Sequence, residues 1–368
     1  MSSIVMNRAL KFAQRNRNFN YIFHRNRATV VVPTNLDTLF ASAGCEESDP
    51  STGAVVAPLH LSTTFERRKD TLEYPGANYY IRTGNPTRDL FETTFAKIEN
   101  GSEAFAFSSG MQACTTIVMA YPGSHILLPN DLYHGVYEIV STIFTKWGAT
   151  YERIDMTDHV LVQSRLEAVR DGIASTSHKK CILWLETPSN PKTKVSDIQQ
   201  LSAIAKSTLG DDRVCVVVDS TWATPYLTRP LTLGADVVMH STTKYVSGHS
   251  DVLAGMLVLG HTATARSILK DLRVCHQIGG GVCAPLESYL CLRGLRTLHV
   301  RMRRHCDSAL ALAQFLSTHP CVSLVHYPGL PTHPQHDVAV KQMGNLFGGM
   351  LSFELKNVGE PEALQVQH

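Results

Sequence analysis

The chain has 368 residues, of which 43% are hydrophobic and 18% are charged, and its formal net charge is +2. This length is sufficient for a large core and suggests two or three domains. The small net charge gives no overall basic field for nucleic acid, and no apolar run approaches the ~18 residues that a membrane span requires.

Residues 1–40 are predicted to form a basic extension. Residues 1–36 contain five arginines and one lysine, and no acidic residue precedes Asp37. This composition is typical of a mitochondrial transit peptide, but a basic tail without a targeting role explains it equally well. No long apolar stretch follows the charges, so a secretory signal is not indicated. We expect a cytoplasmic protein, with mitochondrial targeting as the alternative.

From about residue 100, short apolar runs alternate with longer helix-like segments. Because the runs are continuous rather than alternating, they predict strands that are covered on both faces. The predicted strands are 104–107, 125–129, 181–186, 214–219, 236–240 and 254–259. Helices are predicted at 110–121 and at 196–207, the second with Ser196 as its cap and Gln199 completing a capping box. This order predicts an α/β domain with a mainly parallel sheet.

The pattern changes at about residue 285, where long helical stretches begin. Residues 286–316 are predicted to form two helices separated by an interruption at Gly294. Residues 320–328 and 348–355 are predicted to be strands. Together these elements indicate the start of a second, smaller α+β domain.

The nine cysteines do not form a metal-binding or disulfide pattern. Their number is odd, no CxxC pair occurs, and several lie within apolar runs. We interpret them as reduced and mostly buried thiols of an intracellular protein, and we expect no metal site.

Polar residues that could carry chemistry follow the apolar runs. In open α/β sheets, ligands bind at the carboxyl ends of the strands. The residues at these ends are Ser108, Ser109, Gly110, Glu186, Asn190, Asp219, Ser241, Thr243 and Lys244.

The SSG turn at residues 108–110 precedes a predicted helix, where backbone N–H groups can bind a phosphate. Taken alone, such a turn is more often a simple helix cap. It is neither a dinucleotide fingerprint nor a P-loop, since G-x-G-x-x-G and G-x-x-x-x-G-K are both absent. A nucleotide-binding dehydrogenase is therefore supported only by the sheet pattern.

Asp219 and Lys244 indicate a cofactor site only when they are considered together. Asp219 alone could be a helix cap or half of a salt bridge, and Lys244 alone could be a surface lysine. A lysine in an apolar cleft can form a Schiff base, and a buried aspartate needs a cationic partner. With a phosphate cup, to which the hydroxyls of Ser241 and Thr243 can add donors, they are the three anchors of pyridoxal phosphate.

Eight ordered blocks of the chain, between about Gly53 and Lys356, resemble the cystathionine synthase and lyase family. This family is the transsulfuration branch of the fold-type-I pyridoxal phosphate enzymes, and it implies that fold with a mainly parallel, seven-stranded sheet. The matching blocks are residues 56–65, 79–89, 107–113, 131–135, 186–191, 217–225, 241–251 and 292–302.

The resemblance implies a role for each matched residue. Lys244 would bind pyridoxal phosphate covalently and carry protons, and Asp219 would pair with the ring nitrogen. Tyr133 would stack on the ring and act as a base, and Asn190 would lie near the cofactor oxygen and the substrate carboxylate. The phosphate cup would consist of Gly110, Met111, Ser241 and Thr243.

The resemblance also implies an oligomer with shared sites. Tyr80 and Arg82 resemble the pair that reaches the phosphate of a neighbouring subunit, so the expected catalytic unit is a homodimer, usually paired into a homotetramer. The implied divisions are an N-terminal arm at 41–95, a large cofactor-binding domain at 96–290 and a truncated C-terminal domain at 291–368.

The expected activity is cleavage of a carbon–sulfur bond in an amino-acid substrate. Tyr133 is followed by His134, Gly135 and Val136 rather than by the Gly–Cys pair of methionine γ-lyases. We favour a cystathionine γ-lyase, with a γ-synthase or a β-lyase as alternatives. Because the family's arginine for the substrate carboxylate has no match before His368, another alternative is a catalytically impaired homologue that binds cofactor and serves as an oligomer subunit.

Overall fold

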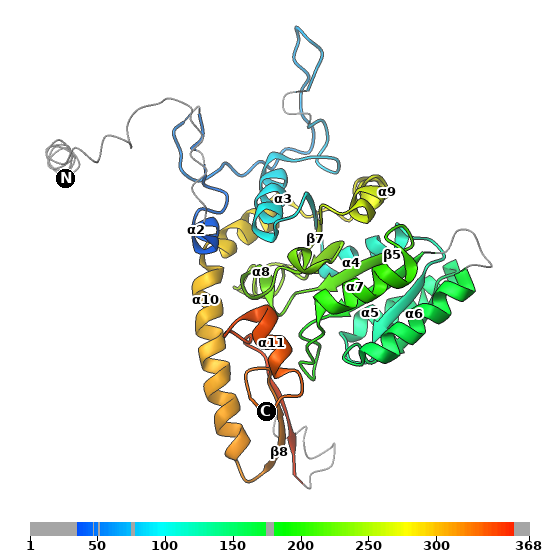
Figure 1. The fold of residues 1–368 in the computed structure, drawn as a ribbon. Coiled ribbons are helices and arrows are strands. Elements are labelled where there is room, and N and C mark those ends of the chain that lie inside the picture. The colour runs from blue at the N-terminus through cyan, green and yellow to red at the C-terminus, as the bar shows by residue number, and fades with distance from the viewer. Residues whose placement is uncertain (1–34, 47, 51, 75–77, 174–179, 357–368) are drawn as a thin grey trace, which may run out of the picture. The chain divides into compact units, whose positions relative to one another are not determined.

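The described residues contain a seven-stranded sheet with the spatial order β1-β7-β6-β5-β4-β2-β3. Helices surround this sheet (Figure 1). The computed structural model describes residues 35–46, 48–50, 52–74, 78–173 and 180–356. Residues 1–34 of the basic extension predicted at 1–40, and the tail 357–368, lie outside these residues.

The sheet is mixed but mainly parallel, as predicted. Strands β3, β2, β4, β5 and β6 are parallel neighbours, and β7 runs antiparallel to both β6 and β1. The bounds are β1 (Glu103–Phe107), β2 (His125–Pro129), β3 (Thr150–Ile154), β4 (Cys181–Glu186), β5 (Val214–Asp219), β6 (Val237–His240) and β7 (Gly255–Leu259). All six predicted strands are confirmed. The unpredicted strand, β3, lies at the sheet edge and is mostly not buried, so it has no continuous apolar run.

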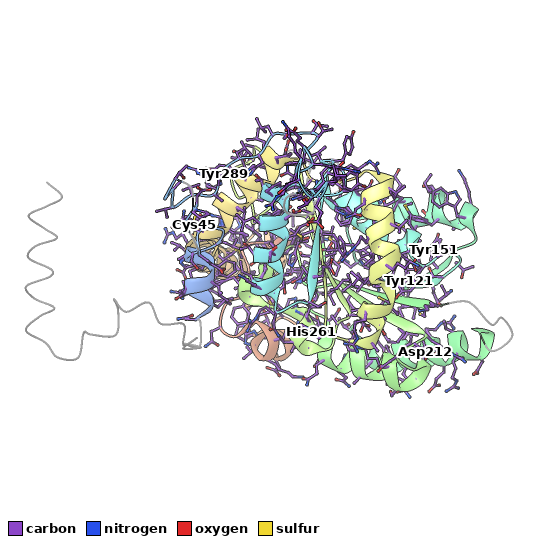
Figure 2. All side chains as sticks on the ribbon, turned by 90° about the horizontal axis from the view of Figure 1, so that it is seen from above. Cys45, Tyr121, Tyr151, Asp212, His261 and Tyr289 are labelled. Atoms are coloured by element: carbon purple, nitrogen blue, oxygen red, sulfur yellow. The ribbon has the colours of Figure 1, made fainter. Side chains whose placement is uncertain are left out.

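Helices cover both faces of the sheet, which is why its strands are so apolar. One face packs against α4 (Gly110–Met119), α5 (His134–Thr142) and α9 (Ala263–Gly279). The other packs against α6 (His159–Ile173) and α7 (Ile198–Leu209). Figure 2 shows side chains filling the space between these layers.

A third core cluster joins the sheet to the C-terminal elements. It contains residues of α3 (Pro86–Glu99) and α10 (Pro285–Thr318), and α10 also contacts α2 (Leu36–Ala41), α8 (Thr224–Leu227) and β8 (Val322–His326) (Figure 1). Strand β8 pairs antiparallel with β9 (Ser352–Leu355), and α11 (His336–Met343) lies between them in the chain. This small antiparallel sheet confirms the expected C-terminal α+β part.

The predicted cap of α7 is wrong by one residue. Asp197, not Ser196, caps this helix, because its carboxylate accepts the N–H of Gln200 at 2.9 Å. The backbone N–H of Ser196 instead bonds the hydroxyl of Thr187 at 3.1 Å. Ser196 therefore belongs to the preceding loop.

The predicted interruption at Gly294 is also wrong, since α10 is one continuous helix. Gly294 is buried in it, and a Cβ atom there would stand 2.3 Å from the carbonyl oxygen of Val246 and 2.5 Å from that of Ser247. The glycine permits close packing of the helix against the loop that follows Lys244. Since α10 also runs through residue 290, the predicted domain boundary at 290/291 falls inside a helix and stays a prediction.

The close approach at Gly294 gives the first testable prediction. An alanine in a helix interior normally stabilises by about 1 kcal/mol relative to glycine. At Gly294 the added methyl must displace backbone, so we expect Gly294→Ala to lower the free energy of unfolding by about 1–3 kcal/mol. Gly279→Ala, whose Cβ would meet no atom within 4 Å, is the matched control and should be neutral or stabilising in urea titrations. A stability gain in Gly294→Ala would contradict the packing described here.

All nine cysteines are free, and six of them are buried. This agrees with their interpretation as buried thiols that do not form disulfides. Within the described residues, no helix combines the length and the apolar character needed to cross a membrane.

Candidate active site

A cavity of about 760 Å³ opens at the carboxyl ends of β4, β5 and β6. Asp219 and Glu186 end neighbouring parallel strands in register, and by strand alternation both point to the face covered by α4, α5 and α9. Eight of the ten residues predicted for the site line this cavity, namely Gly110, Met111, Tyr133, Asn190, Asp219, Ser241, Thr243 and Lys244. Residues that are up to 134 positions apart in sequence thus converge because parallel strands end at one edge.

The N-terminus of α4 meets the hydroxyl of Ser241. Ser109 caps this ten-residue helix and accepts the N–H of Gln112 at 3.1 Å. A Cβ atom on Gly110 would lie 3.0 Å from the Oγ of Ser241, so the glycine leaves room at the point where helix and loop approach each other. Free N–H groups of a first helical turn beside a hydroxyl form a site for an anion such as phosphate.

The hydroxyl of Thr243, which the sequence suggested as a phosphate donor, already forms two hydrogen bonds within the protein. It accepts the N–H of Ala254 and donates to the carbonyl of the same residue, each at 3.0 Å. A hydrogen bond donated by Thr243 to a phosphate would have to replace the bond to that carbonyl.

Asp219 is a buried carboxylate at the cavity wall. Its Oδ1 accepts the backbone N–H of Thr221 at 3.0 Å and the hydroxyl of Thr221 at 2.6 Å. Burial raises the pKa of Asp219, and the bonds from Thr221 oppose that shift in part. None of the described lysine, arginine or histidine side chains forms an ion pair with it. A buried acid in this condition fits a cationic ring nitrogen, as the ring of pyridoxal phosphate provides.

Glu186 is a second acid at the same wall, and the sequence marked it only as the end of a strand. Burial, and then the charge of Asp219, raises its pKa well above the usual range. Its Oε2 accepts the backbone N–H of Tyr133 at 2.8 Å. Glu186 thus fixes the start of the segment that presents the Tyr133 ring.

Lys244 lies on the loop after β6, and its side chain reaches the cavity. No acid of the described chain forms an ion pair with its amine. The Tyr133 ring is half exposed on the cavity wall, and a Cβ atom on Gly135 would stand 2.7 Å from this ring. The cavity thus combines the three groups that pyridoxal phosphate needs. They are an amine without an ion-pair partner, a carboxylate for the ring nitrogen and N–H and hydroxyl donors for the phosphate.

Tyr80 and Arg82 do not line the cavity of their own chain. The guanidinium carbon of Arg82 lies 5.6 Å from the centre of the Tyr80 ring, and Nη1 of Arg82 donates to the carbonyl of Gln277 at 2.7 Å. Their expected role, to reach the phosphate of the cofactor in a neighbouring subunit, stays a prediction.

Several cavity residues were missed by sequence reasoning. The hydroxyl of Thr221, besides bonding Asp219, accepts the N–H of Ser241 at 2.8 Å and so connects β5 to the lysine-bearing loop. Its position two residues after Asp219 was an available signal. Tyr245, Arg301 and His305 also line the cavity, and nothing in their sequence spacing indicated it.

Comparison with known proteins identifies the family of this chain. A model of the family described as Cys/Met metabolism PLP-dependent enzyme matches residues 37–367. A cystathionine β-lyase of Coxiella burnetii is 40% identical over 88% of this chain and 79% of its own, and a cystathionine γ-synthase of Mycobacterium leprae is 42% identical over 88% and 78%.

Among solved structures, a cystathionine γ-lyase from Lactobacillus plantarum complexed with L-serine superposes with a TM-score of 0.78. It is 34% identical and aligns with 88% of this chain and 79% of its own. The names of these relatives all refer to cystathionine, but they give three different reactions. This chain belongs to the Cys/Met metabolism PLP-dependent enzyme family, whose cofactor is pyridoxal phosphate.

Proposed function

We propose that this chain cleaves the carbon–sulfur bond of cystathionine at the γ carbon and, with one water molecule consumed, gives cysteine, 2-oxobutyrate and ammonia. The observation that supports the proposal most strongly is the convergence on one cavity of Lys244, Asp219 and the N-terminus of α4. A site with these three features suits an amino-acid substrate whose α carbon must carry negative charge during the reaction.

Each residue has a distinct task in this proposal. Bound pyridoxal phosphate would supply the electron sink for the substrate carbanion. The Nζ amine of Lys244 would be the base that takes a proton from the substrate α carbon and then one from the β carbon. The γ carbon–sulfur bond then breaks with its electron pair going to sulfur, which takes up a proton as the thiol of cysteine. Asp219 keeps positive charge on the ring nitrogen, while Ser241 and the first N–H groups of α4 hold the phosphate.

Two further residues would position the reactants. Tyr133 would stack against the cofactor ring, and its backbone is held there by the carboxylate of Glu186. Asn190 would approach the cofactor oxygen and the substrate carboxylate, since it lines the cavity directly after β4. Tyr133 is also the second candidate for a base in the reaction.

A γ-synthase and a β-lyase are the alternative candidates, because relatives with these names are 42% and 40% identical to this chain. Supplying cystathionine and identifying the products separates the possibilities. Cysteine with 2-oxobutyrate supports the γ-lyase, whereas homocysteine with pyruvate would establish β-cleavage. Reaction only with an activated homoserine ester and cysteine would establish the synthase and overturn our proposal.

We further propose that the catalytic unit is a homodimer in which residues 41–95 reach the neighbouring site. We expect Arg82→Ala and Lys244→Ala chains each to be inactive alone. Mixed after co-refolding or co-expression, they should recover a measurable share of activity, because one site of the hybrid then receives both an intact Arg82 and an intact Lys244. If the mixture stays as inactive as the separate variants, the site is not shared through Arg82.

A further inference from the structure

Arg301, in the middle of α10, lines the cavity but directs its N–H groups at other parts of the protein. Its Nη1 donates to the carbonyl of Tyr245 at 2.7 Å, and Nη2 donates to the carbonyls of Gly294 at 2.8 Å and Val246 at 3.5 Å. Its Nε donates to the hydroxyl of Thr297 at 3.1 Å. The guanidinium group is therefore largely committed, because it has only five N–H donors.

Two of these carbonyls belong to the lysine loop, which we define as residues 241–248. The carbonyls of Thr243 and Lys244 are bonded within the loop, at 2.9 Å each, by the hydroxyl of Ser247 and the N–H of Gly248. The next two carbonyls are those that Arg301 binds, and the described chain offers them no other hydrogen bond. Arg301 thus completes the hydrogen bonding of the loop directly after Lys244.

Two glycines shape the contact between α10 and the lysine loop. A Cβ atom on Gly248 would stand 2.3 Å from Nη1 of Arg301 and 2.5 Å from its Cζ, so the guanidinium lies against the bare Cα. Gly248 also has a φ of +72°, which favours glycine. On the helix side, Gly294 brings the α10 backbone against the carbonyl of Val246. The loop is consequently held by both the helix surface and the guanidinium.

The charge of Arg301 is placed at some cost. Burial lowers the pKa of Arg301, and none of the described acids forms an ion pair with it. Hydrogen bonds to carbonyls compensate only in part for the free energy of removing this charge from water. If this position served packing alone, an apolar side chain would therefore make the folded state more stable than Arg301 does. The pKa of the nearby His305 is also lowered, first by burial and then by the Arg301 charge.

We propose that Arg301 is a positioning residue that fixes the backbone of the lysine loop, so that the amine of Lys244 returns to one place in the cavity. This inference rests on the proposed role of Lys244 as the cofactor-binding and proton-carrying residue. The competing role, direct binding of a substrate carboxylate, would require Arg301 to release carbonyls that already occupy its donors.

The test uses the full chain with Arg301→Ala, Arg301→Lys and the matched control Arg303→Ala. Arg303 lies on the same helix, but its side chain is 56% exposed and pairs with Asp37. Amide hydrogen exchange in cofactor-free protein should become faster in peptides that cover the lysine loop, and not in peptides that cover β5. After addition of pyridoxal phosphate, the rise of visible absorbance should be slower by about 10- to 100-fold, a size expected for misplaced reacting groups.

The kinetic pattern separates positioning from folding or substrate binding. In Arg301→Ala, kcat should fall while KM changes little, and added guanidinium should restore part of the rate, which methylammonium should not do. Arg301→Lys should be intermediate, because it keeps the charge but not the two-carbonyl fork, and it serves if the alanine variant does not fold. Unchanged loop exchange, or a loss confined to KM, would overturn the proposal. Because exchange is measured without cofactor, it remains decisive even if wild-type protein fails to bind pyridoxal phosphate at Lys244.

Discussion

Replacing Lys244 with alanine is expected to abolish the covalent attachment of pyridoxal phosphate and to lower turnover by about 10³-fold or more. Positioned acid–base groups contribute roughly 10²- to 10⁴-fold to a rate, and Lys244 would serve both as covalent anchor and as proton carrier. The measurement is turnover of the preferred substrate together with the visible absorbance of the bound cofactor.

Two controls separate this loss from unfolding. Lys192→Ala removes an exposed lysine from the loop after β4 and should leave turnover unchanged. A small primary amine added to Lys244→Ala should restore part of the activity, because the truncated side chain leaves space for it in the cavity. Normal turnover by Lys244→Ala would refute the assignment of the lysine.

Asp219→Asn is expected to stabilise the cofactor-free protein while lowering turnover by about 10²- to 10⁴-fold. Asparagine keeps the oxygen that accepts both bonds from Thr221, but it removes the negative charge. Removing one partner of a buried ion pair costs roughly 3–5 kcal/mol. If the other partner of Asp219 is the cationic ring nitrogen, this cost corresponds to a turnover lower by about 10²- to 10⁴-fold.

The pH dependence of stability gives an independent signature of Asp219. Its folded pKa is raised above the ordinary value of 3.8, so between these two values the folded state binds more protons than the unfolded state. The contribution of Asp219 to the stability of the cofactor-free protein should therefore fall as the pH rises from about 4 through the folded pKa, and the difference between wild type and Asp219→Asn isolates it. Asp219→Asn should lack this contribution and keep those of Glu186 and Glu92, two further buried acids whose pKa values are also raised.

Glu186→Gln is the matched control for this prediction. This substitution removes the buried negative charge next to Asp219 and leaves Asp219 itself unchanged. Glutamine still has a side-chain oxygen that can accept the N–H of Tyr133. Thermal unfolding without cofactor should show stabilisation in both variants, whereas cofactor affinity should fall far more in Asp219→Asn. Equal losses of affinity would mean that Asp219 has no special relation to the ring nitrogen.

The sheet could be predicted well because burial on both faces leaves a plain sequence signal. Strands β2, β4 and β5 match their predicted ranges residue for residue, since each contains an uninterrupted apolar run. Strand β3 at the edge is only partly buried and lacks that signal. Gly294 misled the prediction of α10, because a glycine that allows close packing and a glycine that ends a helix look alike in sequence.

The site could be predicted where its residues follow strand ends, and less well elsewhere. Asp219, Lys244 and Gly110 come directly after or soon after apolar runs, so topology alone brings them to one cavity. Arg301 could not be found in this way, because it acts on backbone carbonyls 55 or more positions earlier, which no side-chain pattern reports. The expected role of Arg82 at the phosphate of a second subunit depends on a contact between two chains, which one chain does not contain.

We propose above that the amine of Lys244 binds pyridoxal phosphate covalently in this cavity. The most direct test of this proposal is to load the purified protein with pyridoxal phosphate, reduce it with borohydride and map the modified peptide by mass spectrometry. We expect the visible absorbance to disappear on reduction and the pyridoxyl group to be found on Lys244. A label spread over exposed lysines, or found on another single lysine, would contradict it.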